Sequence, residues 1–173
     1  MVVGGACCCR LRAVEASDVD VMYLWENDPD VWHVSGAAAP ISRDALVRFV
    51  SGSTGDLYAE RQMRLMVDVE GVAVGAVDIF DFDPQHMRFG IGILIYAPEH
   101  RRRGYARAAV EAVVEYAQRG LGLKQVWAMV AADNYGSVAL FESCGFVRCG
   151  TRKSWLRRGA DYVDVYDYQR ILM

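Results

Sequence analysis

The spacing of apolar residues in the middle of the chain changes across a short basic turn. An unbroken apolar run over 89–96 precedes Pro98 and has the length of a buried strand. Beyond the turn, apolar residues recur at intervals of three and four, the spacing of an amphipathic helix: Ala106, Ala109, Val110, Val113, Val114, Ala117 and Leu121. The pattern therefore predicts a strand, a turn that contains Gly104, and a helix.

Short helical and strand patterns alternate in the part of the chain before this segment. A strand pattern over 9–15 comes first, and Ser17 is predicted to cap a helix that packs through Val19, Met22, Tyr23 and Trp25. After an acidic turn over 26–30, Ser42 is predicted to cap a helix that packs through Ala45, Leu46, Phe49 and Val50. Strands over 64–69 and 72–82 flank Glu70-Gly71 and form a predicted hairpin.

The part after the central helix contains one more helix among strands. The patterns predict a strand over 125–130, a helix capped at Asn134 that runs to residue 142, a strand that starts at Phe146, and a closing strand over 162–172. The predicted order is β, α, α, three strands, α, β, α, β, β. Because no repeat, linker or low-complexity tract interrupts it, we expect one domain over residues 1–173.

The turn between the central strand and helix has the features of an anion site. The first N–H groups of a helix have no internal partners and lie at the positive end of its dipole. Gly104 allows close approach of the backbone, and Arg101, Arg102 and Arg103 add cationic groups that suit phosphate oxygens. The alternative is an ordinary turn with a solvated basic tip.

Composition narrows the class of protein. The 173 residues are 53% apolar and 24% charged with a net charge of −3, which is typical of a globular domain and argues against a general nucleic-acid binder. No apolar run reaches the roughly 18 residues that span a membrane, and the first residues lack the basic start of a signal peptide. The spacing of the five cysteines fits neither a disulfide framework nor a zinc site, so we expect reduced thiols in the cytoplasm, with metal binding by the three adjacent ones as the lesser alternative: Cys7, Cys8, Cys9, Cys144 and Cys149.

Two motifs together resemble a known family. Arg101-x-x-Gly104-x-Ala106 resembles the acyl-CoA pyrophosphate loop Q/R-x-x-G-x-G/A of the GCN5-related N-acetyltransferase (GNAT) superfamily. The segment 134–146 resembles its second signature, N-x-x-S-x-x-L-[YF]-x-x-x-G-F. The start of the chain, the Asn-Asp-Pro-Asp turn over 27–30 and the ending over 155–164 are similar to the spermidine/diamine and ribosomal-protein N-acetyltransferase branch.

The resemblance implies a fold and a cofactor. The fold is α+β with three layers: a mixed, mostly antiparallel sheet flanked by helices, whose two central parallel strands splay apart near 93–96 and 127–130. The resemblance implies that acetyl-CoA lies in this gap, with its pantetheine along the first strand and its pyrophosphate on the turn, and that no metal takes part. The residues implied to bind it are Leu94, Ile95, Tyr96, Arg101, Arg102, Arg103, Gly104, Tyr105, Ala106, Asn134, Ser137 and Phe141. Asn134 is equally a good helix N-cap.

The implied reaction is attack of a neutral primary amine on a thioester, which needs a proton acceptor because alkylamines have pKa values near 10. Many relatives have a tyrosine acid where this chain has Phe141. Three outcomes are open: the thiolate leaves unaided, Ser137 or Tyr135 substitutes, or the protein binds acetyl-CoA and catalyses poorly. The acid that this branch often has near Gly90 is also absent. The candidates for the base are Asp78, Asp81, Asp83, Glu26, His86 and His33.

Acidic residues suggest the substrate. If Asp78, Asp81 and Asp83 meet Glu26, Asp28 and Asp30 over the gap, they form an anionic mouth suited to a polyamine such as spermidine; the alternative is two solvated acidic edges. Glu26, Asp78 and Asp81 are the candidate substrate-binding residues. Acetylation of a protein or peptide N-terminus is the second function, and a non-catalytic acyl-CoA-binding regulator is the third. The sequence leaves a homo-oligomer open, since Trp155, Tyr162, Tyr166 and Tyr168 form either an aromatic surface or core.

Overall fold

A seven-stranded mixed sheet forms the centre of the molecule. The computed structural model describes residues 9–35 and 39–172, with the backbone alone for 33–35; Cys7, Cys8 and the His33 side chain lie outside this description. The strands are β1 (Arg10–Ala13), β2 (Met63–Val69), β3 (Val72–Asp83), β4 (Arg88–Ile95), β5 (Gln125–Ala131), β6 (Val147–Arg158) and β7 (Asp161–Ile171). Their order across the sheet is β1-β2-β3-β4-β5-β7-β6. Only the β4–β5 pair is parallel among these neighbours, which confirms the mixed, mostly antiparallel sheet.

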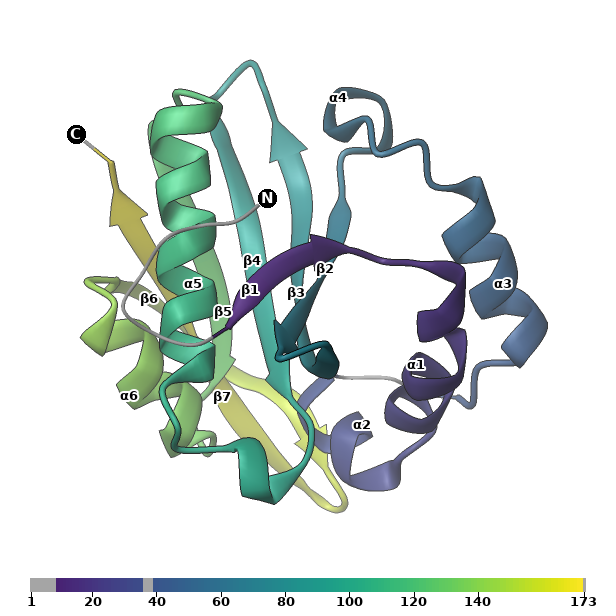
Figure 1. Cartoon of the computed structure of the whole chain (residues 1–173). Helices are drawn as coiled ribbons and strands as arrows, with labels where there is room; N and C mark the ends of the chain where they lie inside the picture. Colours follow the sequence, from purple (N-terminus) through teal and green to yellow (C-terminus); the bar gives the residue numbers. More distant parts are fainter. Residues whose placement is uncertain (1–8, 36–38, 173) are drawn as a thin grey trace.

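Helices cover both faces of this sheet. They are α1 (Val19–Glu26), α2 (Pro29–Ser35), α3 (Arg43–Gly52), α4 (Leu57–Glu60), α5 (Tyr105–Glu115) and α6 (Tyr135–Ser143). Short 3-10 turns η1 (Ala16–Asp18) and η2 (Pro98–His100) precede α1 and α5, and the π turn η3 (Tyr116–Gly120) continues α5. Figure 1 shows α5 lying across one face of the sheet, while α1 to α3 are grouped away from α5 and α6. No helix in the described part of the chain is long and apolar enough to cross a membrane.

Alternation along the strands divides the core into two clusters. Leu65, Val67 and Val77 pack in the cluster that includes α5 and α6. Met66 and Ala76 point to the other side of the sheet and pack with Val19, Met22, Trp25 and Leu46. This is the period of two expected of a sheet with both faces covered. The predicted apolar face of the central helix is confirmed at Ala109, Val110, Val113, Val114 and Ala117, which are buried.

Three local predictions were wrong. Ser17 does not cap α1, because it lies inside η1, where Glu15 and Asp18 form a reciprocal capping box. Tyr23 and Phe49 were predicted to face inward, but both are 40% exposed. The sequence reading also missed α4, a single turn whose first amides, those of Tyr58 and Ala59, donate to the Asp56 carboxylate.

The cysteines and aromatic residues are dispersed. Cys9 is half-buried, Cys144 is buried and Cys149 is exposed. Burial raises the pKa of the Cys144 thiol.

The four aromatic residues of the C-terminal hairpin do not form one surface, because Tyr168 is buried while Trp155 and Tyr162 are exposed.

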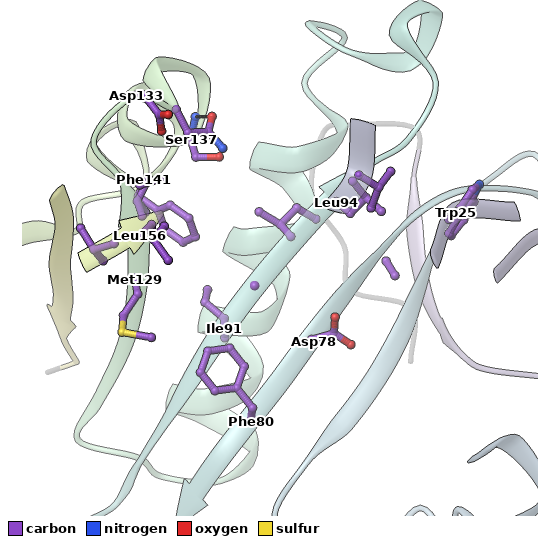
Figure 2. Close-up of a pocket in the computed structure, with 18 of the residues that line it drawn as sticks. Trp25, Asp78, Phe80, Ile91, Leu94, Met129, Asp133, Ser137, Phe141 and Leu156 are labelled. Atoms are coloured by element: carbon purple, nitrogen blue, oxygen red, sulfur yellow. Dashed lines mark hydrogen bonds between the residues drawn. The ribbon is translucent and has the colours of Figure 1, made fainter. Parts of the chain in front are cut away.

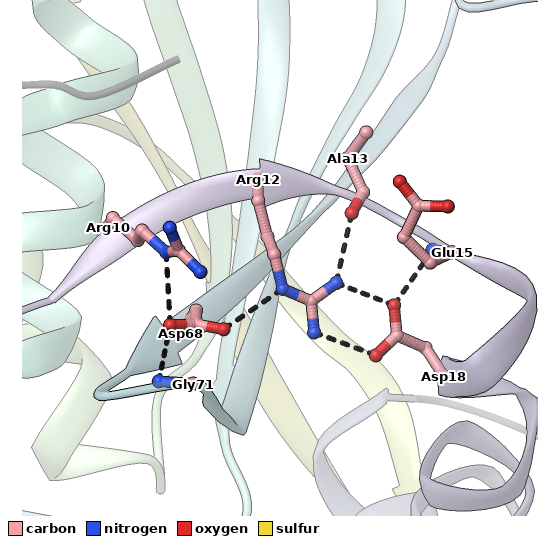
Figure 3. A network of polar contacts seen from close by, with 7 residues as sticks. All are labelled: Arg10, Arg12, Ala13, Glu15, Asp18, Asp68 and Gly71. Atoms are coloured by element: carbon pink, nitrogen blue, oxygen red, sulfur yellow. Dashed lines mark hydrogen bonds and ion pairs between the residues drawn. The ribbon is translucent and has the colours of Figure 1, made fainter.

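An ion-pair network with two buried carboxylates joins β1 to β2 and to η1, just before α1 (Figure 3). Asp68 accepts hydrogen bonds from the Arg12 and Arg10 side chains at 3.0 and 3.1 Å and from the Gly71 amide at 3.0 Å. Arg12 also donates to both carboxylate oxygens of Asp18 at 2.7 and 2.8 Å. Asp18 and Asp68 are only 4% and 3% exposed. The network therefore fixes the first strand and the entry to α1.

Replacing Asp68 with Asn should lower the free energy of unfolding by about 2 kcal/mol at pH 7, the scale of lost hydrogen bonds to a charged group. Burial opposes the charge of Asp68, but Arg12, Gly71 and Arg10 outweigh it and lower its pKa. The charged form therefore stabilises the fold above pH 4 and stops doing so as the pH falls through the lowered pKa. Urea unfolding of both proteins between pH 7 and 3 should show the difference shrinking in acid.

The exposed pair of Asp44 and Arg48 supplies a matched control for this substitution. Because Asp44→Asn removes an exposed i,i+4 partner, it should change stability by no more than about 0.5 kcal/mol. Equal losses in the two variants would contradict the importance given to the buried network.

Candidate active site

The two parallel strands separate after a short paired stretch. Pairing between β4 and β5 is confined to residues 88–90 and 125–127, and Gly90 opposite Trp127 is the last pair. Each strand continues on its other side, β4 with β3 as far as Ile95 and β5 with β7 as far as Ala131. The splay expected near 93–96 and 127–130 is therefore confirmed.

The separation leaves part of the β4 backbone without a strand partner on its β5 side. The Tyr96 amide donates to Val74 on β3. Because successive residues of a strand point their backbone groups to opposite sides, those of Ile93 and Ile95 face the gap. The Ile95 carbonyl accepts from Arg101. An extended ligand in the gap can therefore pair with this edge as an added strand would.

A cavity of about 760 Å³ occupies the gap between the strands. Its walls come from both faces of the sheet, since neighbours such as Ile93 and Leu94 both line it. Figure 2 shows Asp78 and Phe80 on the β3 side of the cavity, and Met129, Phe141 and Ser137 on the β5 and α6 side. The cavity thus joins the second sequence motif, on α6, to the acidic residues Glu26 and Asp78.

An aromatic pair closes the end where the strands meet. Phe80 and Trp127 pack edge to face with ring centroids 5.1 Å apart. The Phe80 ring fills the space beside Gly90, because a Cβ at that residue would lie 2.4 Å from Cε2 of the ring. The carboxylate sought near Gly90 is therefore replaced by an aromatic ring from the neighbouring strand.

The predicted phosphate turn has the backbone of an anion site. Gly104 is the N-cap of α5 at φ 85°, and Arg102 also has a positive φ of 59°. Gly104 brings no side chain to the first amides of the helix, so these stay available to a ligand. Arg101 donates to the Ile95 and Tyr96 carbonyls at 3.1 and 2.6 Å, which ties the turn to the end of β4. Arg102 and Arg103 are exposed, and residues 101–106 lie outside the cavity lining.

The second motif forms the opposite wall. Asn134 caps α6 by accepting from the Ser137 amide at 3.1 Å, and Asn134, Ser137 and Phe141 all line the cavity. Phe141 is 3% exposed and packs edge to face on Phe146 at 5.1 Å. Tyr135, the other candidate for the missing acid, is 79% exposed and is not part of the lining.

The structure brings together two of the predicted acidic residues and separates the others. Glu26 and Asp78 line the cavity. Asp81 is exposed at a β-bulge with a positive φ of 50°, and it does not reach the cavity. Asp83 accepts from the His86 amide, and Asp28 accepts from the Tyr96 hydroxyl at 2.9 Å. Among the described residues, the anionic mouth is thus reduced to two carboxylates on this side.

Several cavity residues were missed by the sequence analysis. Arg64 donates to both Glu26 and Asp78. Asp133 and Arg158 form an ion pair at 3.4 Å on the other wall, where Met129 and Trp155 are exposed. For the contacts of Arg64, the one indication in the sequence was an arginine on a predicted strand next to a predicted strand that carries aspartates.

Comparison with known proteins identifies the class. The profile of the acetyltransferase (GNAT) domain family matches residues 9–147. Spermidine N(1)-acetyltransferase of Vibrio cholerae is 29% identical over 140 residues, which are 81% of this chain and 79% of that protein. The uncharacterized N-acetyltransferase YoaA of Bacillus subtilis is 30% identical over 160 residues, 91% of this chain and 90% of that protein.

Solved structures share the fold. The crystal structure of spermidine N-acetyltransferase from Vibrio cholerae in complex with CoA and spermine superposes with a TM-score of 0.84 at 24% identity, covering 95% of each chain. An acetyltransferase of the same family from Bacillus anthracis superposes with a TM-score of 0.80 at 21% identity. The chain therefore belongs to the GNAT acetyltransferase family. It is an N-acetyltransferase, and acetyl-CoA is the acetyl donor that GNAT enzymes use.

Proposed function

We propose that this chain transfers the acetyl group of acetyl-CoA to a primary amino group of a polyamine. The observation that carries the proposal is the placement of Glu26 and Asp78 in the wall of the cavity that opens between β4 and β5. Relatives that are 29% and 21% identical to this chain are spermidine N(1)-acetyltransferases of Vibrio cholerae and Escherichia coli. Carboxylates are the groups that attract and hold an ammonium ion.

The gap fits the donor in three respects. The backbone of Ile93 offers N–H and C=O groups to an extended amide-containing arm. The start of α5, which has no side-chain cap, offers amides to a pyrophosphate. The lining of the cavity is mostly apolar. When bound, acetyl-CoA supplies the acetyl group as a thioester. Residues of α6 line one side of the cavity, and Asp78 lines the other (Figure 2).

The chain's own groups have two tasks in the transfer. Asp78 and Glu26 can hold the amine and accept its proton directly or through water, after which the nitrogen lone pair is free to attack. A backbone N–H of β4 can donate to the carbonyl oxygen as negative charge develops on it. The C–N bond then forms as the C–S bond breaks, and the electron pair leaves with sulfur. Phe141 offers no proton to the leaving thiolate, but Ser137, one turn earlier on the same wall, has a hydroxyl.

An amine panel tests the proposal. The protein is incubated with acetyl-CoA and equimolar putrescine, spermidine, spermine and peptides that begin with Ala or Ser, and products are identified by mass. Acetylated polyamines with unmodified peptides are expected, and the KM for the polyamine should rise with salt. Acetylated peptides alone would overturn the proposal in favour of N-terminal acetylation. Bound acetyl-CoA without any product would favour the regulator.

A further inference from the structure

Arg64 lies between the two carboxylates of the cavity wall. Its Nε and Nη2 atoms donate to the two oxygens of Asp78 at 2.6 and 2.9 Å, and Nη1 donates to Glu26 at 2.5 Å. The Arg64 and Glu26 side chains are 20% and 24% exposed, whereas the Asp78 side chain is 42% exposed. All three residues line the cavity. A substrate ammonium that approaches these carboxylates therefore meets a cation already in place.

The sheet register sets this group beside the opened strand. Arg64 is opposite Asp78 in the β2–β3 pair, and Asp78 is opposite Gly92 in the β3–β4 pair. Neighbouring strands are about 4.8 Å apart, so the guanidinium starts from a backbone roughly 10 Å from Gly92. Gly92 comes two residues after the last β4–β5 pair and carries no side chain. An amine that reaches the gap from this side therefore passes within the field of Arg64.

The charge of Arg64 is permanent. Burial works against its charge, but hydrogen bonds and ion pairs with Asp78 and Glu26 outweigh burial and raise the pKa of the guanidinium. Glu26, Asp78 and Arg64 together carry a net charge of −1. On the opposite wall Asp133 and Arg158 neutralise each other. The described lining thus has three carboxylates and two guanidinium groups, for a net charge of −1.

We propose that Arg64 is a specificity-determining residue that restricts the amine substrate to a diamine; this rests on the proposed function. The reacting amino group must be neutral when it attacks. Once the proton of that group has passed through the carboxylates or water to the solvent, a diamine keeps one ammonium group, which the single net negative charge of the wall balances. A triamine keeps two and a tetramine keeps three, and the additional charges are repelled by Arg64. A wall with two unpaired carboxylates would favour the longer amines.

Variants that change the charge of the trio in steps test the proposal. Arg64→Met leaves two carboxylates, and Arg64→Met with Glu26→Gln restores a net charge of −1. Initial rates for putrescine, spermidine and spermine give kcat and KM for each amine, and calorimetry gives the affinity of each amine for the CoA-bound protein. Arg88→Met is the matched control, because Arg88 pairs with Asp83 outside the cavity lining.

The wild-type protein is expected to prefer putrescine to spermidine by about tenfold in kcat/KM. Arg64→Met should shift that ratio at least about tenfold toward spermidine, mainly through KM and affinity. The double variant should restore the wild-type ratio. Arg88→Met should leave it unchanged. If Arg64→Met does not fold, Glu26→Gln supplies the test, since a neutral trio should weaken the binding of every polyamine and that of the longer ones most.

Two results would overturn the proposal. Spermine as the preferred wild-type substrate would contradict the charge argument while leaving polyamine acetylation intact. An unchanged ratio of the kcat/KM values for putrescine and spermidine in folded Arg64→Met would also contradict the charge argument and leave polyamine acetylation intact. Acetylation of none of the three amines would instead remove the proposed function, and the role of Arg64 with it.

Discussion

A Gly104→Asp variant is expected to lose at least about 100-fold in affinity for CoA and acetyl-CoA while it keeps its fold. The new carboxylate would stand at the N-cap of α5, where the first amides of the helix and the basic turn attract an anion. A negative charge at that place competes with the pyrophosphate and repels it. Calorimetric titration with CoA measures the loss, and thermal unfolding shows that the fold is intact.

The positive φ of Gly104 calls for a control that separates charge from backbone strain. Gly122 also has a positive φ, 63° against 85°, and a Cβ there would meet nothing within 4 Å. Gly122→Asp therefore introduces the same residue with similar strain beyond the far end of α5. It should bind CoA as the wild-type protein does. Unchanged affinity in folded Gly104→Asp would refute the placement of the pyrophosphate on this turn.

A Phe141→Tyr variant is expected to raise kcat by about 100-fold without a change in CoA affinity. Phe141 lines the cavity from α6, at the position where the second motif in many relatives has tyrosine. A phenol there can donate a proton to the departing sulfur, and general acid catalysis contributes 100-fold or more. The lower end of that range is expected, because a thiol with a pKa near 8.5 needs less help from an acid than a more basic leaving group does.

The partner ring supplies the control for this variant. Phe146 packs on Phe141 and is equally buried, but it is not part of the cavity lining. Phe146→Tyr therefore adds the same hydroxyl next to the site without reaching it, and kcat should stay at or below the wild-type value. An unchanged kcat in folded Phe141→Tyr would show that the missing phenol does not limit the reaction.

The sequence predicted the elements that depend on local pattern. Apolar residues at intervals of three and four correctly predicted the buried side of α5. Asn134 caps α6 as expected. The splay followed from resemblance, since no local pattern indicates where a parallel pair will stop. The short turns η1 and α4 were missed, because a single turn has too few residues to show a period.

The Arg64 contact depends on a bulge that the sequence does not reveal. A regular hairpin that starts with Val69 opposite Val72 would place Arg64 opposite Val77. The register shifts by one residue at Val67–Asp68, and this shift brings Arg64 opposite Asp78. Asp81 lies at a second bulge, between Phe80 and Asp83, and its odd spacing from Asp78 already places it on the opposite face of a regular strand. Alternation counted from the hairpin turn gives the wrong partner for Arg64, because the bulge at Val67–Asp68 adds a residue to one strand.

The β6–β7 hairpin shows the same limit. Its register shifts between Arg152 and Leu156, and Ser154 has a positive φ of 48°. Trp155 belongs to this irregular stretch and reaches the cavity, although it lies on the strand farthest from β1 in the sheet order. The alternation of the C-terminal segment predicted a strand, but it could not predict which aromatic residue would face the site.

Amide hydrogen exchange with and without acetyl-CoA tests the central claim, that the donor lies along β4 in the gap left by β5. The amides of Ile93 and Ile95 face this gap and have no strand partner there, so they should exchange rapidly in the free protein and slow down when acetyl-CoA is added. The amides at the start of α5 should slow down with them. Protection confined to other strands, with these amides unchanged at saturating acetyl-CoA, would contradict the account.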